Sequence, residues 1–410
     1  MERLFNCLKT IERNRRSPLG RYLDRLAQHY SESGYCRQYS RRQIYLAGQF
    51  GQWLHEHRVP WAQMRADHVA KFLRHRHRSR EQHLGDRAFF KPLCHLLVGD
   101  GVIDLARDVT KKSPAKILVD EFSVYLQQER QLAATTGDRY AALIRDWLCD
   151  WAGDGAMNLI SLSAGEVVTY VQRRAPTMAR KTAKLMVAAM RAFLNYARYR
   201  GLIRSDLAIG IPPVADWSRT SIPRGLPPQD IRRVLRCCDR GRPTGRRDYA
   251  ILLLLARLGL RACEIAGLGL DDIDWKVGLL TVRGKGDVSR LPLPSDVGKA
   301  IAMYLRSGRP RSKCRHVFLR GVAPAVPFKR PGSIGTVVHH ALMRANVDSV
   351  RRGSHQFRHT LATEMLRRGA SLAEIGELLR HRNVQTTTIY AKVDLMALRT
   401  LAAPWPGGSP

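Results

Sequence analysis

The sequence is poor in acidic residues for its length. It holds 35 Asp and Glu residues against 69 Lys and Arg residues in 410 positions, which gives a formal net charge of +34 at pH 7. Positive charges in this excess repel each other in a folded chain unless an anionic partner screens them. The composition therefore favours a partner with a phosphate backbone over the alternative of a ribosomal or membrane-binding basic surface.

Two further absences narrow the class of protein. The longest apolar run, Ala250–Ala256, is far shorter than a bilayer span, and the charges within residues 1–16 argue against a secretory signal. The eight cysteines include no C-x-x-C pair, which argues against zinc ribbons and against a disulfide scaffold. We therefore expect a cytoplasmic protein with reduced thiols, no metal site and no membrane partner.

Proline pairs indicate how the chain is divided. Residues 208–230 contain two Pro-Pro pairs and interrupt the helical spacing, which is typical of an interdomain linker, and a softer boundary lies near residues 106–116. A chain of this length also exceeds one ordinary core. We predict an N-terminal helical domain over 1–108, a second helical domain over 112–210, a linker over 211–223, a third domain over 224–400 and a flexible tail over 401–410.

The two segments before the linker share an apolar pattern with helical spacing. The matched pairs are Leu46 with Ile144, Phe50 with Leu148, Trp53 with Trp151, Val69 with Val167, Phe72 with Tyr170 and Leu73 with Val171. Duplication of a small helical bundle accounts for this pattern, and chance similarity of amphipathic helices is the alternative. The basic stretch 74–83 in the first copy is either a phosphate contact or a solvated loop.

The third domain combines helices with a hairpin. Residues 246–268 predict a buried helix that stops at Gly259 before a second helix begins, and residues 279–294 predict a β-hairpin around a Gly-Lys-Gly turn. Helical spacing resumes at Gly332, and Ser371 with Glu374 is in capping-box register. The fold class is therefore mainly α with a small β-hairpin or sheet, an α+β arrangement.

Six side chains of the third domain carry chemistry of one kind. His355 and Arg358 are three residues apart on a predicted helix and share its face. Arg261 begins a helix, with Glu264 three residues on to brace its guanidinium. The other three are Lys285 at the hairpin tip, His381 after a capped helix, and Tyr390 on the next helix.

This set suits a metal-free attack on a phosphodiester. Two arginines can clamp the non-bridging oxygens and neutralise charge that grows in the transition state. The same cations favour phenolate, so we expect a lowered tyrosine pKa. An imidazole can accept the phenolic proton and a lysine can protonate the departing sugar oxygen. The product is a covalent phosphotyrosine, and no cofactor is required.

The motifs "GLRACEI", "HQFRHT" and "RHRNVQTTTIY" together resemble the tyrosine recombinase (phage integrase-like, Xer-like) family. The resemblance is strong over 224–392 and looser over 116–211, which is similar to the family's SAM-like core-binding domain. It implies that Arg261 and Arg358 bind the scissile phosphate. Tyr390 would attack to form a 3′-phosphotyrosine with a free 5′-hydroxyl. His355 would handle the tyrosine's proton, Lys285 that of the leaving group, and His381 would hydrogen-bond the phosphate.

Two features depart from the family pattern. Arg380 stands where the family commonly has glycine, which adds positive charge beside the site for an adjacent phosphate. The additional N-terminal segment would extend the DNA footprint or carry a protein contact.

The resemblance implies a site-specific DNA recombinase or integrase of a mobile element, cytoplasmic and nucleoid-associated. Its partner would be double-stranded DNA, with a homodimer on each site, a homotetramer in the synaptic complex and accessory recombination proteins. Residues 395–403 would dock on a neighbouring subunit or on their own domain. The alternatives are a type IB topoisomerase-like enzyme that nicks and reseals DNA, and a DNA-binding regulator without catalytic activity.

Overall fold

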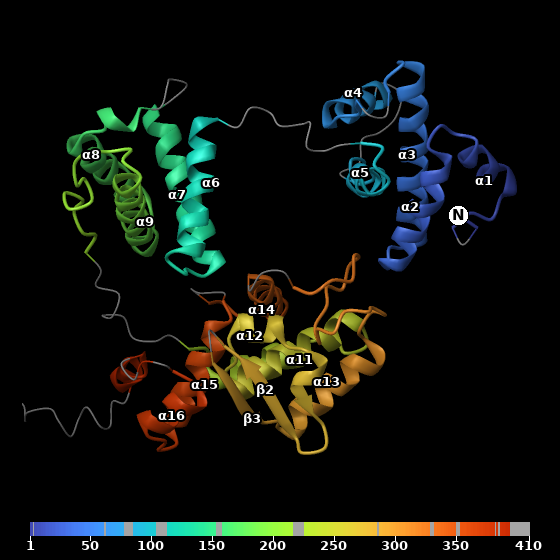
Figure 1. Ribbon diagram of the computed structural model, residues 1–410. Coiled ribbons are helices and arrows are strands. Elements are labelled where there is room, and N and C mark those ends of the chain that lie inside the picture. The colour runs from blue at the N-terminus through green and yellow to red at the C-terminus, as the bar shows by residue number, and fades with distance from the viewer. Residues whose placement is uncertain are drawn as a thin grey trace, which may run out of the picture. The chain divides into compact units, whose positions relative to one another are not determined.

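The structure is a computed structural model that describes residues 1–2, 4–60, 63–77, 85–103, 113–152, 158–215, 225–284, 287–328, 332–349, 353–381, 383 and 386–393. These residues are mainly helical and include one three-stranded antiparallel sheet, which confirms the predicted fold class (Figure 1). The predicted tail 401–410, the segment 395–403, residues 78–83 and 216–223, and Lys285 lie outside the described residues.

The chain divides into two compact units, one of which is Leu105–Thr220 and the other Met1–Asp104 with Ser221–Pro410. Buried apolar residues of the unit that includes both chain ends form one cluster between residues 4 and 103, another between 226 and 357, and a small one of Ala362, Ile375, Leu379 and Tyr390. None of the helices in the described part of the chain is long and apolar enough to cross a membrane.

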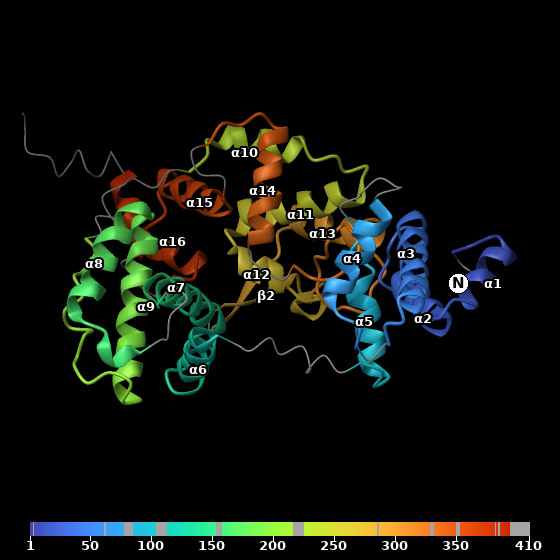
Figure 2. The ribbon, with the colours of Figure 1, turned by 90° about the horizontal axis from the view of Figure 1, so that it is seen from above.

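The first segment is a helical bundle in which α2 packs on α1, α3 and α5 (Figure 1 and Figure 2). Its helices are α1 (Leu8–Arg15), α2 (Gly20–Glu32), α3 (Arg37–Glu56), α4 (Ala66–His77) and α5 (Phe90–Gly99). The positions that share the repeated pattern, Leu46, Phe50, Trp53, Val69, Phe72 and Leu73, are all buried. The apolar stripe of each helix thus faces the bundle core.

The second segment is also a helical bundle, in which α7 packs on α6 and α9. Its elements are α6 (Pro114–Gln128), α7 (Ala134–Ala152), η3 (Leu159–Ser161), α8 (Ala164–Arg174), η4 (Ala175–Thr177) and α9 (Arg180–Tyr199). A capping box of Ser163 and Glu166 starts α8. The matched residues are buried here too, apart from half-buried Trp151, which donates its indole N–H to Glu166 Oε1 at 3.0 Å. Duplication stays a prediction.

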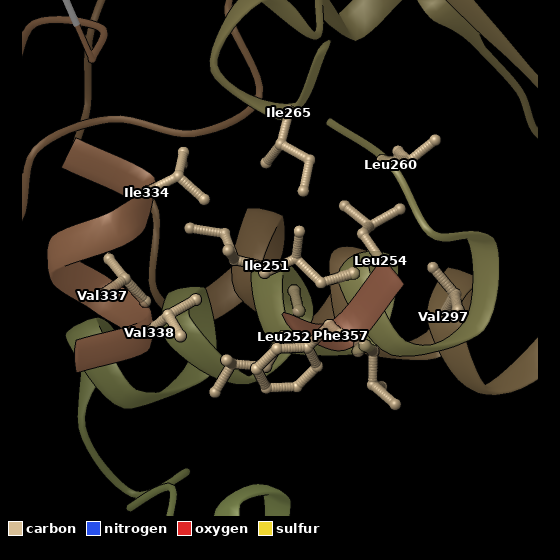
Figure 3. Close-up of a cluster of buried hydrophobic side chains, with 14 of the residues drawn as sticks. Ile251, Leu252, Leu254, Leu260, Ile265, Val297, Ile334, Val337, Val338 and Phe357 are labelled. Atoms are coloured by element: carbon tan, nitrogen blue, oxygen red, sulfur yellow. The ribbon is translucent and has the colours of Figure 1, made fainter. Parts of the chain in front are cut away.

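The third segment surrounds a helix whose middle, Ala250–Leu255, is apolar and buried on all sides. Its elements are α10 (Pro228–Arg236), α11 (Pro243–Leu258), α12 (Ala262–Gly267), η6 (Leu270–Asp272), β1 (Ile273–Asp274), β2 (Leu279–Arg283), β3 (Val288–Pro292), α13 (Ser295–Ser307), α14 (Gly332–Arg344), α15 (His355–Arg367), α16 (Leu372–Leu378) and η8 (Thr388–Val393). Figure 3 shows Ile251 and Leu254 of α11 with Val338 of α14 and Phe357 of α15. α11 therefore forms the centre of this core and supports the elements that carry the predicted site.

The predicted helix stop, hairpin and cap are confirmed. Gly259 ends α11 in a left-handed conformation (φ +55°), and a Cβ there would lie 2.8 Å from Leu379 Cδ2, so the position requires glycine. In the hairpin, β2 pairs with β3, and the Gly284 N–H donates to the Asp287 carbonyl at 2.7 Å. Ser371 and Glu374 form the capping box of α16.

Candidate active site

Five of the six predicted site residues lie in the described part of the chain, at four places between residues 261 and 390. Arg261 precedes α12, His355 and Arg358 lie on α15, His381 follows α16, and Tyr390 is on η8. η8 is a six-residue 3-10 helix that contacts α15 and α16, so the tyrosine is next to the helix that carries Arg358. The nucleophile candidate and the arginines thus belong to one local assembly of the same chain.

Arg358 is buried, with 4% of its surface exposed. Its guanidinium donates to the Gly259 carbonyl at 2.6 Å and to the Leu379 carbonyl, so two chain turns hold it in place. Burial, followed by the charges of Arg261 and Arg380, lowers the pKa of Arg358 to about 10. The group stays protonated at pH 7, and an anion placed beside it would relieve the cost of burying this charge.

Arg261 is half-buried and braced by Glu264, as the three-residue spacing predicts. Its Nη1 donates to Glu264 Oε1 at 2.8 Å, and its backbone N–H donates to Glu264 Oε2 at 2.8 Å. Its Nη2 donates to the Arg380 carbonyl at 2.9 Å, which joins α12 to the turn after α16. This arrangement fixes the guanidinium plane and leaves part of its edge accessible to a ligand.

Arg380 is a second arginine that forms an ion pair with the Glu264 carboxylate. Its side chain is 8% exposed, and its Nη2 donates to Glu264 Oε2 at 2.8 Å. The backbone there is left-handed (φ +54°), a conformation in which glycine carries no steric cost. Its buried Nε has no hydrogen-bond partner among the described residues. The arginine that replaces the family's glycine is therefore built into the site.

We expect the substitution Glu264→Gln to destabilise the third domain by about 3 kcal/mol, because it removes the carboxylate charge shared by two buried or half-buried guanidinium groups. The midpoint of urea unfolding would measure this loss. The matched control is Asp287→Asn, an exposed carboxylate residue beside the same pocket, which should change stability by less than about 0.5 kcal/mol. Equal effects of the two substitutions would show that the carboxylate charge of Glu264 is not structural.

Tyr390 is buried in a small apolar cluster with Ala362, Ile375 and Leu379, and 1% of its surface is exposed. Burial raises the pKa of Tyr390 to about 12, although the positive charge of Arg358 acts in the opposite direction. The prediction of a lowered tyrosine pKa is therefore wrong for this arrangement, because desolvation of the phenolate outweighs the nearby cation.

The partner of the tyrosine hydroxyl is His359, which was not among the six predicted residues. His359 Nδ1 lies 2.9 Å from Tyr390 Oη, and the two rings meet edge to face with centroids 5.7 Å apart. His355 begins α15 and is exposed. His355 and His359 are four residues apart on one helix face, so that spacing could have indicated both histidines as candidates.

His381 lies in the turn between α16 and η8, where its Nδ1 is 2.7 Å from Oγ1 of buried Thr387. Burial, followed by the charge of Arg358, lowers the pKa of His381 to about 4. The imidazole is therefore neutral at pH 7. If Nδ1 accepts the threonine hydroxyl proton, Nε2 carries the remaining hydrogen and can donate it to a substrate oxygen.

A pocket of about 380 Å³ lies beside Arg261 and His381. Its lining includes Arg261, Glu264, Arg380 and His381, together with Gly284 and Asp287 of the hairpin. Gly284 and Asp287 flank residues 285–286, so the described residues on both sides of this pair line the pocket. Among the described residues, no group of three or more His, Cys, Asp and Glu could hold a metal ion.

Two family models match separate parts of the chain. Residues 224–396 match the phage integrase family, and residues 119–201 match the phage integrase N-terminal SAM-like domain. The chain is 43% identical over 408 residues to the "Putative integrase/recombinase y4rA" of Sinorhizobium fredii, a match that covers 99% of both proteins. It is 30% identical over 289 residues to the tyrosine recombinase XerD of Lacticaseibacillus casei, a match that covers 67% of this chain and 92% of the relative.

Solved structures share the fold. The XerH site-specific recombinase bound to its palindromic difH substrate aligns with a TM-score of 0.55 at 16% identity, over 70% of this chain and 84% of that one. The integrase of transposon Tn1549, in complex with a circular intermediate DNA, aligns with a TM-score of 0.51 at 15% identity, over 70% and 99%.

Proposed function

The chain belongs to the phage integrase family of tyrosine recombinases, site-specific DNA recombinases that act by tyrosine transesterification, and on this premise we propose how its residues divide the reaction. Tyr390 Oη attacks the scissile phosphorus, the bond from phosphorus to the 5′-oxygen breaks, and a 3′-phosphotyrosine forms. The 5′-hydroxyl that is released later attacks the phosphotyrosine and rejoins a strand. Each bond broken is replaced by one of the same kind, so the exchange requires no energy source.

The arginines bind the phosphate in this proposal. Arg358 and Arg261 each direct N–H donors at non-bridging oxygens and stabilise the charge of the pentavalent transition state. The supporting observation is that buried Arg358 is held by two backbone carbonyls while it interacts electrostatically with both Arg261 and Tyr390. These interactions support the proposal that the two arginines and Tyr390 act on one phosphate.

Three further groups complete the proposed assignment. Lys285 protonates the departing 5′-oxygen, and its neighbour Gly284 lines the pocket. His381, neutral at pH 7, donates a hydrogen bond to a phosphate oxygen. His355, exposed at the start of α15, supplies a further hydrogen-bonding group and is the family's candidate for the tyrosine's proton. Incubation with a nicked duplex that traps the cleaved strand tests the assignment, because a covalent protein–DNA adduct must accumulate.

We propose double-stranded DNA as the partner and strand exchange of a mobile element as the outcome. XerH and the Tn1549 integrase are both described in complexes with DNA. We further propose that the chain is divided into domains over 1–108, 112–210 and 224–400, a linker over 211–223 and a tail over 401–410. Two dimers of the chain would assemble as a tetramer. The nick-and-reseal alternative predicts relaxation of supercoiled DNA without recombinant products on paired sites.

Binding to DNA should weaken steeply with salt. The net charge of +34 favours many phosphate contacts, and each neutralised phosphate contributes a slope of about −0.9 to log K against log salt. With about six or more contacts, affinity should fall at least 10³-fold between 50 and 200 mM salt. Fluorescence anisotropy with a labelled duplex measures this slope. A flat titration would contradict the proposed basic DNA-binding surface.

A further inference from the structure

We propose that His359 is a catalytic residue, which takes the proton of Tyr390 when the strand is cleaved and returns it when the strand is rejoined. The inference rests on the proposed function, since it assumes that Tyr390 is the nucleophile. It moves the proton transfer from His355 to a histidine one helical turn further along α15. The observation that carries it is the 2.9 Å contact between His359 Nδ1 and Tyr390 Oη.

The packing around the tyrosine favours a proton acceptor within the protein. Tyr390 is enclosed by Ala362, Ile375 and Leu379, and only 1% of its surface reaches solvent. Water therefore has little access to the hydroxyl. A phenol proton that leaves in this environment needs a base already in hydrogen-bond contact, and His359 meets that geometric requirement.

The neighbouring charges favour a transient imidazolium. Tyr390 faces His359 from η8, and His381 interacts with it from the turn after α16, where its own pKa is lowered partly by His359. Arg358, the preceding residue on α15, acts electrostatically on both Tyr390 and His381. The positive charge of the adjacent Arg358 opposes a lasting positive charge on His359, so a proton taken from Tyr390 is readily returned.

The proposed step conserves atoms and charge. His359 begins neutral, with Nδ1 as acceptor and the ring hydrogen on Nε2. As the bond between Oη and phosphorus forms, the Oη–H bond breaks and its proton moves to Nδ1. The 5′-oxygen leaves with the electron pair of its bond to phosphorus and receives a proton from a separate acid. In rejoining, the released phenolate oxygen recovers the proton from Nδ1.

The test compares His359→Asn with His355→Asn in single-turnover cleavage. Asparagine Oδ1 can accept the hydrogen bond that His359 Nδ1 accepts, yet it cannot take the proton. The probe is a nicked duplex whose sequence the full chain has selected from a randomised pool. We expect His359→Asn to bind this probe normally and to cleave it roughly 10²–10⁴-fold more slowly at pH 7. The deficit should narrow as pH rises towards the Tyr390 pKa of about 12, because a growing fraction of the phenol is then already ionised and needs no base.

A second variant separates proton transfer from positioning. His359→Ala opens space beside Tyr390, and added imidazole should restore part of its cleavage rate, with the rescue following the pKa of substituted imidazoles. The idea is overturned if His359→Asn cleaves at the wild-type rate. It is also overturned if its deficit is independent of pH and His359→Ala shows no rescue, because His359 would then only position the tyrosine.

The wild-type chain distinguishes the failure of this inference from failure of the proposed function. If wild type forms no covalent adduct with the probe, Tyr390 is not acting as a nucleophile and the proposed function itself is wrong. If wild type forms the adduct while His355→Asn alone shows the pH-dependent deficit, only the assignment to His359 is wrong. Thermal unfolding of each variant checks that the third domain remains folded.

Discussion

Replacing Tyr390 by phenylalanine is expected to abolish the covalent adduct between the chain and a nicked duplex. The substitution removes one oxygen atom and keeps the ring that fills the cluster of Ala362, Ile375 and Leu379. The fold and DNA binding should therefore persist while the nucleophile is lost. Denaturing gel electrophoresis with an end-labelled strand measures the adduct directly, since a covalent complex migrates with the protein.

The matched control for this substitution is Tyr304→Phe. Tyr304 is equally buried in the third domain, where its hydroxyl accepts a hydrogen bond from the Leu319 N–H at 3.3 Å, and it belongs to the α11 core cluster. We expect Tyr304→Phe to form the adduct as wild type does. An adduct that persists in Tyr390→Phe would mean that another side chain attacks the DNA.

Arg358→Ala should reduce cleavage by roughly 10³-fold or more, while much of the DNA affinity remains. The guanidinium contributes chiefly where charge accumulates on the phosphate, so its loss raises the barrier more than it weakens the ground-state complex. Cleavage rate at saturating protein and affinity by anisotropy are measured on the same duplex. A parallel loss of binding and cleavage would assign Arg358 to ordinary DNA binding.

Arg257→Ala is the control for the loss of a positive charge from the same domain. Arg257 lies in the last turn of α11, is exposed, and pairs with Asp296 at 2.8 Å. We expect it to leave the cleavage rate nearly unchanged. Arg358→Lys adds a second comparison, because lysine keeps the charge but cannot donate in the forked geometry that spans the Gly259 and Leu379 carbonyls.

Local signals in the sequence predicted the elements that position the site. Gly259, the Gly-Lys-Gly turn and the Ser371–Glu374 capping box each act within a few residues, so the helix stop, the hairpin and the start of α16 follow from short-range chemistry. The Arg261–Glu264 contact is of the same kind, because residues three apart on a helix are neighbours.

The features that could not be predicted depend on long-range packing. Arg380 and Glu264 are 116 positions apart along the chain, and their ion pair exists only because the turn after α16 returns to the start of α12. Which of His355 and His359 contacts the Tyr390 hydroxyl depends on where η8 packs against α15.

The direction of the Tyr390 pKa shift is also a product of packing. It depends on burial, which the spacing of charged residues does not report. With this raised pKa the phenol carries its proton at pH 7, and removal of that proton is the step we assign to His359.

Identification of the amino acid attached to the DNA tests the central claim most directly. Trypsin should release the peptide Asn383–Lys392, which contains Tyr390 as its one tyrosine. After nuclease digestion of the trapped adduct, mass spectrometry should find a nucleotide 3′-phosphate on Tyr390, and the released strand should carry a free 5′-hydroxyl. Attachment to any other residue, or a phosphate left on the 5′ end, would contradict the mechanism.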